Sequence, residues 1–372
     1  MLKRLDINHF TVFKDAGFEF GPGLNVLIGD NGTGKTHVLK LGYMFCRAWP
    51  ALMQTKLRLG KQRAESYLEE RLAGLFKTGQ LTNLISQGHR NGAELSAQVV
   101  GRIPMQIGMP SEALEAAGME EAMAWDIRLR RAPDGGARVD AQALPDSASR
   151  NAFVPRSVFI PSKEVVSLFK GLVGLFESFR DFPLDETYRD LAAAMATLEP
   201  RQPSLLMTPL VDRIVKLLGG ELAMEQGELL FRRLDSTTLE SQLLAEGHRK
   251  LALLIYLLRH DLIERGGTVF WDEPEANLNP AAIKLLAEAL HTLSGHGVQV
   301  ILATHSLFLL RELEILGDMK RVPAQPAHRY FALGRKGGHV VVSVGDDIAA
   351  IDPLVLLDEE IQQSDRFLAA AK

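Results

Sequence analysis

The sequence predicts an α/β fold built around a parallel sheet, and three apolar segments carry this prediction. Residues 24–28, 268–271 and 298–303 are short and almost wholly apolar, as strands buried on both faces are. Each is followed by a segment with helical spacing, at 37–47, at 280–293 and from 307 onward. Because strands that alternate with helices pair in parallel, we expect a parallel central sheet.

The other elements follow from local patterns. We expect strands at 5–13, 17–20, 94–100, 125–130 and 157–160, a hairpin over 221–232 that turns at Gly227, and two edge strands at 329–333 and 339–344. We expect helices within 38–85, at 111–121, at 243–258, and over 164–218 with breaks near Pro183 and between Pro200 and Pro209. Residues 132–149 are rich in Pro, Gly, Asp and Ser and predict a flexible loop.

The first apolar strand leads directly into the sequence G-x-x-x-x-G-K-T at residues 29–36. In a strand–loop–helix context, such glycines let backbone N–H groups wrap a polyphosphate, while the lysine reaches the outer phosphates and the hydroxyl reaches Mg²⁺. The segment therefore predicts binding of a nucleoside triphosphate. The expected nucleotide-binding residues are Asn31, Gly32, Thr33, Gly34, Lys35, Thr36 and His37.

Polar side chains follow the other two buried strands. Asp272 ends the strand that begins at Thr268, in the position to hold Mg²⁺ with Thr36, and Glu273 is placed to polarise an attacking water. A solvated acidic turn is the alternative reading of this pair. His305 ends the next strand and can reach a γ-phosphate; taken alone it would be read as a residue that caps the following helix, as we expect for Ser306.

Taken in order, these motifs resemble the ATP-binding-cassette ATPases of the SMC, RecF and OLD branch. The resemblance rests on residues 5–10, 18–29 and 272–280 and covers roughly 1–45 and 240–310. It implies a cassette-type P-loop ATPase head with a mixed central sheet, an antiparallel β subdomain and a compact helical lobe. No sustained heptads lie between Lys35 and Asp272, so we expect no long coiled coil.

The resemblance also implies a site shared between two heads. Each bound nucleotide would meet a signature motif from the opposite head, here Ala245, Glu246, Gly247 and His248. Gly247 matches a family glycine, whereas Ala245 stands where the family usually has serine. Asn277 and Asn279 would lie in the loop that crosses the dimer interface. The segment after residue 160 lacks the family's glutamine. Either Ser162 or Glu164 approaches the metal in its place, or the segment is an ordinary helix cap.

We expect three parts along the chain. Residues 1–163 would form the N-terminal part of the head, 164–240 the helical lobe and the hairpin that lead to the signature, and 241–372 the C-terminal part. Only a short tail follows His305, and it contains no Asp-x-Asp pair of the kind a metal-dependent nuclease uses. A nuclease or toxin would then be a separate chain.

Composition and charge indicate the class of protein and its compartment. The chain has 372 residues, a net charge of −4 and one cysteine, which indicates a globular protein of a reducing compartment without a global footprint for nucleic acid. The apolar runs are too short to cross a bilayer, so we expect a cytoplasmic protein. A modest basic cluster consists of Lys56, Arg58, Lys61 and Arg63. It has two interpretations, contact with the phosphates of a nucleic acid or a solvated helix face.

These observations lead to one hypothesis and two alternatives. The first is a Mg²⁺-dependent ATPase with Lys35, Glu273 and His305 as catalytic residues, which dimerises or assembles further on ATP and controls a separate effector, as compact relatives of bacterial anti-phage defence systems do. The second is a RecF-like repair ATPase that clamps DNA. The third is a nucleotide-locked scaffold with little turnover, which the alanine at position 245 favours.

Overall fold

The fold is known from a computed structural model, which describes residues 1–53, 60–89, 91–103, 119–145, 153–179, 182–196, 208–319, 328–352 and 355–370. The strands are β1 (Leu2–Asn8), β2 (Asp15–Glu19), β3 (Leu24–Gly29), β4 (Ala93–Ile103), β5 (Met119–Arg131), β6 (Ala137–Ala143), β7 (Ser157–Ile160), β8 (Gly220–Glu225), β9 (Glu228–Arg233), β10 (Thr238–Glu240), β11 (Thr268–Asp272), β12 (Gln299–Thr304), β13 (Arg329–Lys336) and β14 (His339–Gly345). The α-helices are α1 (Lys35–Met53), α2 (Lys61–Phe76), α4 (Phe169–Ser178), α5 (Glu186–Ala196), α6 (Thr208–Leu218), α7 (Glu246–Arg259), α8 (Pro280–Gly295), α9 (Leu307–Met319) and α10 (Val355–Ala370).

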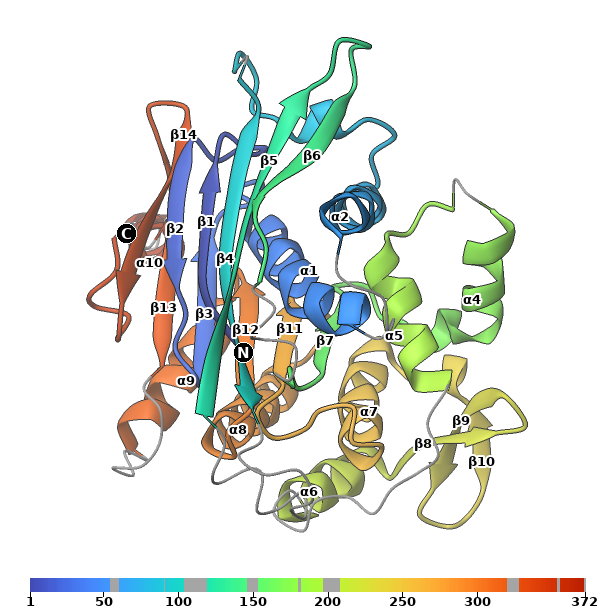
Figure 1. Cartoon of the computed structure of the whole chain (residues 1–372). Helices are drawn as coiled ribbons and strands as arrows, with labels where there is room; N and C mark the ends of the chain where they lie inside the picture. Colours follow the sequence, from blue (N-terminus) through green and yellow to red (C-terminus); the bar gives the residue numbers. More distant parts are fainter. Residues whose placement is uncertain are drawn as a thin grey trace.

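A six-stranded sheet in the order β14-β13-β3-β12-β11-β7 lies at the centre of the molecule (Figure 1). Every neighbouring pair is parallel except β13 and β14, so the predicted mixed sheet with a parallel core is confirmed. Strands β3, β11 and β12 are buried along their whole length. Such strands lie under helices on both faces, which explains why their sequences are apolar without alternation.

Each face of this sheet belongs to a different hydrophobic core. On β12, Val300 and Leu302 enter the core that contains α7, α8 and α9, whereas Ile301 and Ala303 enter the core that contains α1. The second core is closed by a five-stranded antiparallel sheet in the order β2-β1-β4-β5-β6, so α1 lies between two sheets (Figure 1). The antiparallel β subdomain is therefore confirmed.

The helical lobe comprises α4, α5 and α6 and is followed by a small antiparallel sheet in the order β10-β9-β8. The hairpin that we predicted over 221–232 is confirmed, with Gly227 at its turn and a φ of +80°. The longest described helix, α1, has 19 residues, so the described residues contain no long coiled coil. The three-part division of the chain stays a prediction, although β3, β7 and β11–β14 from its first and third parts share one sheet.

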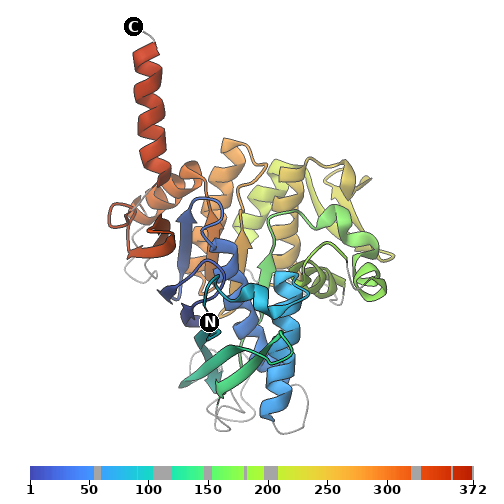
Figure 2. The same ribbon diagram turned by 90° about the horizontal axis from the view of Figure 1, so that it is seen from above.

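Several predicted elements were wrong in detail. The expected loop over 132–149 contains strand β6, which pairs with β5. Strand β13 is an interior strand between β3 and β14, not an edge. The helix expected at 111–121 falls largely on residues 111–118, which lie outside the described residues, and Met119 already begins β5. At the C-terminus, α10 extends away from the rest of the molecule (Figure 2).

Candidate functional site

The P-loop joins β3 to α1 through backbone conformations that need glycine. At Gly29 the φ is +152°, and an added Cβ would lie 2.2 Å from the backbone oxygen of Leu333 on β13. At Gly34 the φ is +93°, and an added Cβ would lie 2.6 Å from the ring of Phe13. Both positions exclude any other residue, because the backbone conformation and the close neighbours would each oppose a side chain.

Lys35, the first residue of α1, folds back over this loop. Its ammonium group donates hydrogen bonds to the backbone oxygens of Gly29 at 2.6 Å and Asp30 at 2.9 Å. Burial lowers the pKa of Lys35, and the nearby carboxylates of Glu273 and Asp272 oppose that shift. A cation held at the mouth of a loop of backbone N–H groups is suited to bind phosphate oxygens.

Thr36 and Asp272 meet although they lie far apart in the sequence. The Thr36 hydroxyl donates to the two carboxylate oxygens of Asp272, at 2.9 and 3.1 Å. Asp272 is 7% exposed, and its burial raises the pKa of the carboxyl group to about 6. A hydroxyl and a carboxylate side by side next to a phosphate loop fit Mg²⁺, a hard cation that prefers oxygen ligands and keeps several waters.

Glu273 and His305 come together at the same edge of the sheet. Glu273 follows β11, and its backbone N–H bonds to the oxygen of Ala303, which keeps it beside the end of β12. His305 follows β12, and its Nδ1 lies 3.4 Å from Glu273 Oε1. Both side chains are partly exposed, 33% and 47%, so a water or phosphate group can reach them.

Glu275, which the sequence analysis did not assign to the site, supports this edge of the sheet through hydrogen bonds to Thr304 and His305. Its carboxylate accepts hydrogen bonds from the Thr304 hydroxyl at 2.6 Å and from the His305 backbone N–H at 3.3 Å. The Glu275 side chain is 5% exposed, which separates it from the more open Glu273. Lys250 on α7 is also buried and donates to the backbone oxygen of Glu273 at 3.1 Å. The two loops that present Glu273 and His305 are thus fixed by buried polar contacts.

The predicted signature segment forms the start of α7. Ala245 is the N-cap residue and provides no side-chain hydrogen bond, and Glu246, Gly247 and His248 form the first turn. Gly247 packs closely on the loop after β11, since an added Cβ would lie 2.5 Å from the backbone oxygen of Asn277. Within that loop, Asn277 has a φ of +65°.

Two residues with proposed interface or metal roles make local side-chain contacts. Asn279 caps α8 by accepting a hydrogen bond from the Ala282 N–H at 2.9 Å. Glu164, one of the two alternatives for the glutamine position, accepts bonds from the backbone N–H and the hydroxyl of Ser167 and pairs with Arg249 of α7 at 2.9 Å. Glu164 is thus engaged by Ser167 and Arg249, and its approach to a metal stays a prediction. Ser306 caps α9 through Leu309 N–H, as expected.

A cavity of about 930 Å³ opens beside the P-loop helix. His37, which follows Thr36, lies in its wall and shares a hydrogen bond of 2.9 Å with the Thr11 hydroxyl. Burial lowers the pKa of His37 to about 4, so the ring is neutral at physiological pH. Arg335 of β13 also lines the cavity and donates to the backbone oxygen of Gly32 in the P-loop, a contact that the sequence did not reveal.

The remaining P-loop residues divide by exposure. Asn31 is exposed, Gly32 has a φ of +76°, and the buried Thr33 hydroxyl donates to the Asp30 oxygen at 2.8 Å. These residues form the turn that the phosphate-binding motif requires. Their role in binding nucleotide stays a prediction.

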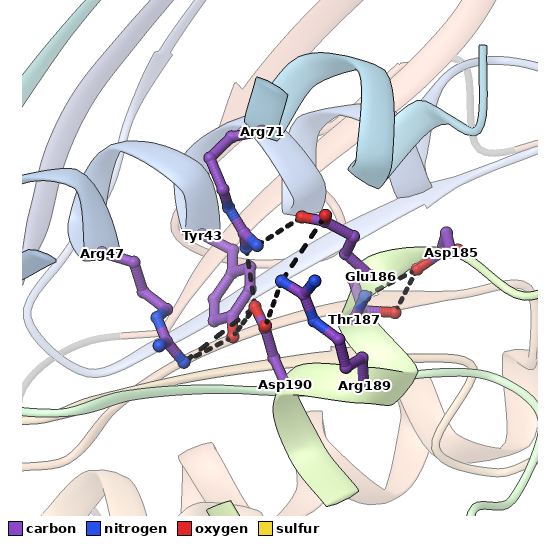
Figure 3. A network of polar contacts seen from close by, with 8 residues as sticks. All are labelled: Tyr43, Arg47, Arg71, Asp185, Glu186, Thr187, Arg189 and Asp190. Carbon is purple, nitrogen blue, oxygen red and sulfur yellow. Dashed lines mark hydrogen bonds and ion pairs between the residues drawn. The ribbon is translucent and has the colours of Figure 1, made fainter. Parts of the chain in front are cut away.

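A buried network of charges joins the P-loop helix to the helical lobe (Figure 3). Arg71 of α2 contacts Glu186 at 2.5 Å and Asp190 at 2.6 Å, both on α5. Tyr43 of α1 donates to Asp190 at 3.0 Å and accepts from Arg47 at 3.1 Å. Because Tyr43, Arg71 and Asp190 are buried, the network is a specific connection between α1, α2 and α5.

The remaining observations concern the basic cluster, membrane-spanning helices and clusters of metal ligands. In the basic cluster, Lys56 and Arg58 lie outside the described residues, and Lys61 pairs with Asp140 at 2.9 Å. Across the described ranges, no helix combines the length and apolarity needed to cross a membrane. The same residues contain no cluster of three or more His, Cys, Asp or Glu side chains able to hold a metal ion.

Comparisons with known proteins relate the chain to families of nucleotide-dependent proteins. Residues 140–311 match the family described as "AAA domain, putative AbiEii toxin, Type IV TA system". The chain is also 45% identical over 42 residues to the DNA replication and repair protein RecF of Streptococcus equi subsp. zooepidemicus and of subsp. equi. The match spans 11% of this chain and 11% of the length of these curated relatives.

Among solved structures, the chain is similar to an SMC head bound to the C-terminal winged-helix domain of ScpA. The TM-score is 0.53 with 13% identity, over 92% of this chain and 97% of that chain. The SMC head domain from Thermotoga maritima also matches over 92% of this chain and 97% of that chain, at 14% identity and a TM-score of 0.46. The first likeness shows the fold, and together with the family match it confirms the resemblance to SMC- and RecF-like ATPases of the ATP-binding-cassette type.

Proposed function

Starting from this SMC/RecF-like ATPase, we propose that the chain binds ATP with Mg²⁺, dimerises head-to-head on ATP, and hydrolyses it to ADP and phosphate. We further propose that it serves as the cytoplasmic sensor or scaffold subunit of an anti-phage defence system and controls a separate nuclease or toxin. The contact between Thr36 and Asp272 carries the catalytic part of this proposal, because it joins the P-loop to the acidic strand end in a pair suited to Mg²⁺.

The geometry supports a distinct role for each side chain. The Lys35 ammonium, now 2.6 Å from the Gly29 oxygen, would turn from the loop carbonyls to the outer phosphates. Thr36 and Asp272 would hold Mg²⁺, which when bound neutralises charge on the β- and γ-phosphates. Glu273 would accept the proton of the attacking water. His305, whose Nδ1 lies 3.4 Å from Glu273 Oε1, would contact the γ-phosphate.

A second head would complete the site. The first turn of α7 presents backbone N–H groups and the positive end of a helix dipole, both suited to a γ-phosphate. In the proposed dimer, Ala245, Glu246, Gly247 and His248 of one head would meet the nucleotide of the other, and Asn277 and Asn279 would lie between the heads. Loss of the γ-phosphate would then part the heads, which makes the dimer a switch.

The role in defence rests on two observations of different kinds. The matching family carries "putative AbiEii toxin, Type IV TA system" in its description, which associates this ATPase type with toxin systems. The second is the arrangement of the site itself, an ATPase-type phosphate loop beside an acidic strand end, to which we assign the sensing part while a separate nuclease or toxin acts as effector. This part of the proposal is an analogy at the level of fold and family.

The catalytic proposal is tested by Glu273→Gln, which keeps the shape of the side chain but removes the base. We expect phosphate release to fall by about 10²-fold or more, as for loss of a general base, while ATP binding is retained. The exposed Glu240→Gln is the matched control and should keep the parental rate. Phosphate release by Glu273→Gln at the parental rate would show that Glu273 is not the base.

A RecF-like DNA clamp is the second candidate, and the RecF match favours it. It predicts ATPase activity stimulated by DNA and binding that weakens steeply with salt. In this case Lys61→Gln together with Arg63→Gln should weaken DNA binding and reduce its salt dependence. No change in either property would remove the basic segment from the DNA interface.

The third candidate is a nucleotide-locked scaffold with little turnover. Ala245 favours it, because the N-cap of α7 offers no hydroxyl to a γ-phosphate. Restoring a donor by Ala245→Ser should raise phosphate release if the missing hydroxyl limits hydrolysis. A parental rate in that variant would mean that position 245 does not control turnover.

A further inference from the structure

Lys250 is a buried lysine on α7 to which the proposed mechanism gives no role. It lies in the second turn of the helix, and the residue is 2% exposed. Burial lowers the pKa of Lys250, and the surrounding carboxylates, of which Glu275 has the largest effect, oppose that shift. An ammonium group is costly to take out of water unless it is paired or hydrogen-bonded, so its partner indicates what it does.

The hydrogen-bond partner of Lys250 is a backbone group of the proposed base. The ammonium group donates to the backbone oxygen of Glu273 at 3.1 Å. Because the contact is made to the main chain, it holds the backbone of Glu273 and leaves the carboxylate available for other contacts.

Glu273 has a backbone conformation that residues with a side chain rarely adopt. Its φ is +48°, in the left-handed region, where a Cβ comes too close to the backbone. Such a conformation persists only where the surrounding structure holds it, and it is frequent at functional sites. The contacts that hold the backbone of Glu273 therefore help to place its carboxylate.

Three hydrogen bonds hold this backbone. The Glu273 N–H donates to the oxygen of Ala303 at 2.9 Å, and the Glu273 oxygen accepts from the Ala276 N–H at 3.2 Å as well as from Lys250. Ala276 belongs to the same loop, so its bond moves with the loop. Ala303 of β12 and Lys250 of α7 belong to other elements and anchor Glu273 to the sheet and to the helix.

Helix α7 is a firm support for this anchor. Residues 251–258 are all buried, and packed interiors deform little. At the other end of the loop, Gly247 lies so close to Asn277 that an added Cβ would be 2.5 Å from the Asn277 backbone oxygen. The helix therefore contacts both ends of the loop that carries Glu273.

The backbone of Glu273 decides where its carboxylate lies. In the present conformation, Glu273 Oε1 is 3.4 Å from His305 Nδ1, and the Glu273 side chain is 33% exposed. A rotation of the backbone would move the carboxylate away from His305, and a displacement of about 1 Å can cost a factor of about 10² in rate. Loss of the Lys250 contact would permit such a rotation.

We propose that Lys250 is a positioning residue for Glu273. Its hydrogen bond to the Glu273 oxygen maintains the left-handed conformation, and that conformation keeps the carboxylate beside His305, where water is to be activated. Lys250 acts through Glu273 and has no contact with the reacting atoms. The inference rests on the proposed ATPase activity.

The first test is Lys250→Met, which keeps the length of the side chain and removes the donor. We expect kcat for phosphate release to fall by about 10- to 100-fold, while the dissociation constant for ATP, measured by equilibrium titration, stays within about twofold of the parental value. Lys216→Met is the matched control, because Lys216 is exposed on α6, and it should keep both values. A parental kcat in Lys250→Met would overturn the inference.

A double-mutant cycle separates positioning from a general loss of structure. In Glu273→Gln the base is absent, so the addition of Lys250→Met should change the residual rate by less than about twofold. A purely structural role would lower the rate by the same factor with and without Glu273, and that result would overturn the inference.

The same variants distinguish this inference from the proposed function. A parental rate in Glu273→Gln would overturn the proposed function, and the inference with it. A reduced rate in Glu273→Gln together with a parental rate in Lys250→Met would overturn the inference alone.

A second background covers the case in which Lys250→Met unfolds because the charge of Glu275 is left buried. Glu275→Gln removes that charge and keeps an oxygen that can accept from the Thr304 hydroxyl. Lys250→Met added to Glu275→Gln should lower kcat by about 10- to 100-fold relative to Glu275→Gln alone. Equal rates for these two proteins would overturn the inference.

Discussion

Gly247 provides a test of how closely the signature helix packs on the loop after β11. Replacement by alanine would place a Cβ 2.5 Å from the backbone oxygen of Asn277 and 3.0 Å from a methyl group of Leu278. Real Cβ atoms essentially never approach within 3.0 Å, so α7 and the loop must separate by at least about 0.5 Å. Overpacking of this kind costs about 1–3 kcal/mol and replacing glycine in a helix gains about 1 kcal/mol, so we expect a net loss of up to about 2 kcal/mol.

The matched control is Gly174→Ala. Gly174 lies in α4, is exposed, and has no atom within 4 Å of the added Cβ. This variant should be more stable than the parent by about 0.5–1 kcal/mol. Urea unfolding followed by far-ultraviolet circular dichroism should therefore rank Gly174→Ala above the parent and Gly247→Ala below it. If Gly247→Ala equals or exceeds Gly174→Ala in stability, the close packing of α7 on the Asn277 loop is refuted.

Two further predictions concern buried ionisable groups. Burial lowers the pKa of His37 and of His328 to about 4, so the folded state disfavours both charged forms, and each should lower stability by about 1.4 kcal/mol per pH unit as pH drops from 6.5 toward 4. In thermal melts His328→Gln should reduce this slope by the contribution of His328, the exposed His339→Gln should keep it, and an unchanged slope in His328→Gln would contradict it. Arg71→Leu leaves the Asp190 carboxylate buried without its closest cation and should lower unfolding free energy by about 3–5 kcal/mol. Exposed Arg138→Leu is its control, and equal denaturation midpoints for the two variants would contradict a buried network.

Buried strands were the easiest elements to predict, because both of their faces are apolar. The runs at 24–28, 268–271 and 298–303 became β3, β11 and β12, and the polar residues after them meet at one edge of the sheet. That convergence follows from parallel pairing, since the carboxyl ends of parallel strands share an edge. It explains why Thr36 and Asp272 could be placed together from sequence.

Elements whose pattern depends on a partner were predicted less well. Strand β6 has only Val139 and Ala141 as buried apolar residues, and the preceding Pro-Asp-Gly-Gly turn dominated the composition of its segment. Strand β13 alternates in part, as an edge strand does, but β14 covers its outer side. Neither pairing is visible until the neighbouring strand is known.

The polar residues that support the site were not predictable, for a similar reason. On α2 and α5, Arg71 and Asp190 occupy helices rich in charge and look like solvent-facing residues. Their burial results from the packing of α5 against α2, which no local pattern contains. Glu275 looked like one more residue of an acidic turn, yet its contact with Thr304 needs β12 beside it.

The proposal depends most directly on whether ATP joins two heads. The decisive measurement is the molar mass by light scattering, with and without ATP and Mg²⁺, for the parent and for Glu273→Gln. The account predicts that ATP doubles the mass of the parent, and that Glu273→Gln holds the dimer after the parent has returned to monomer. A monomer that persists in both proteins at saturating ATP would contradict the head-to-head mechanism.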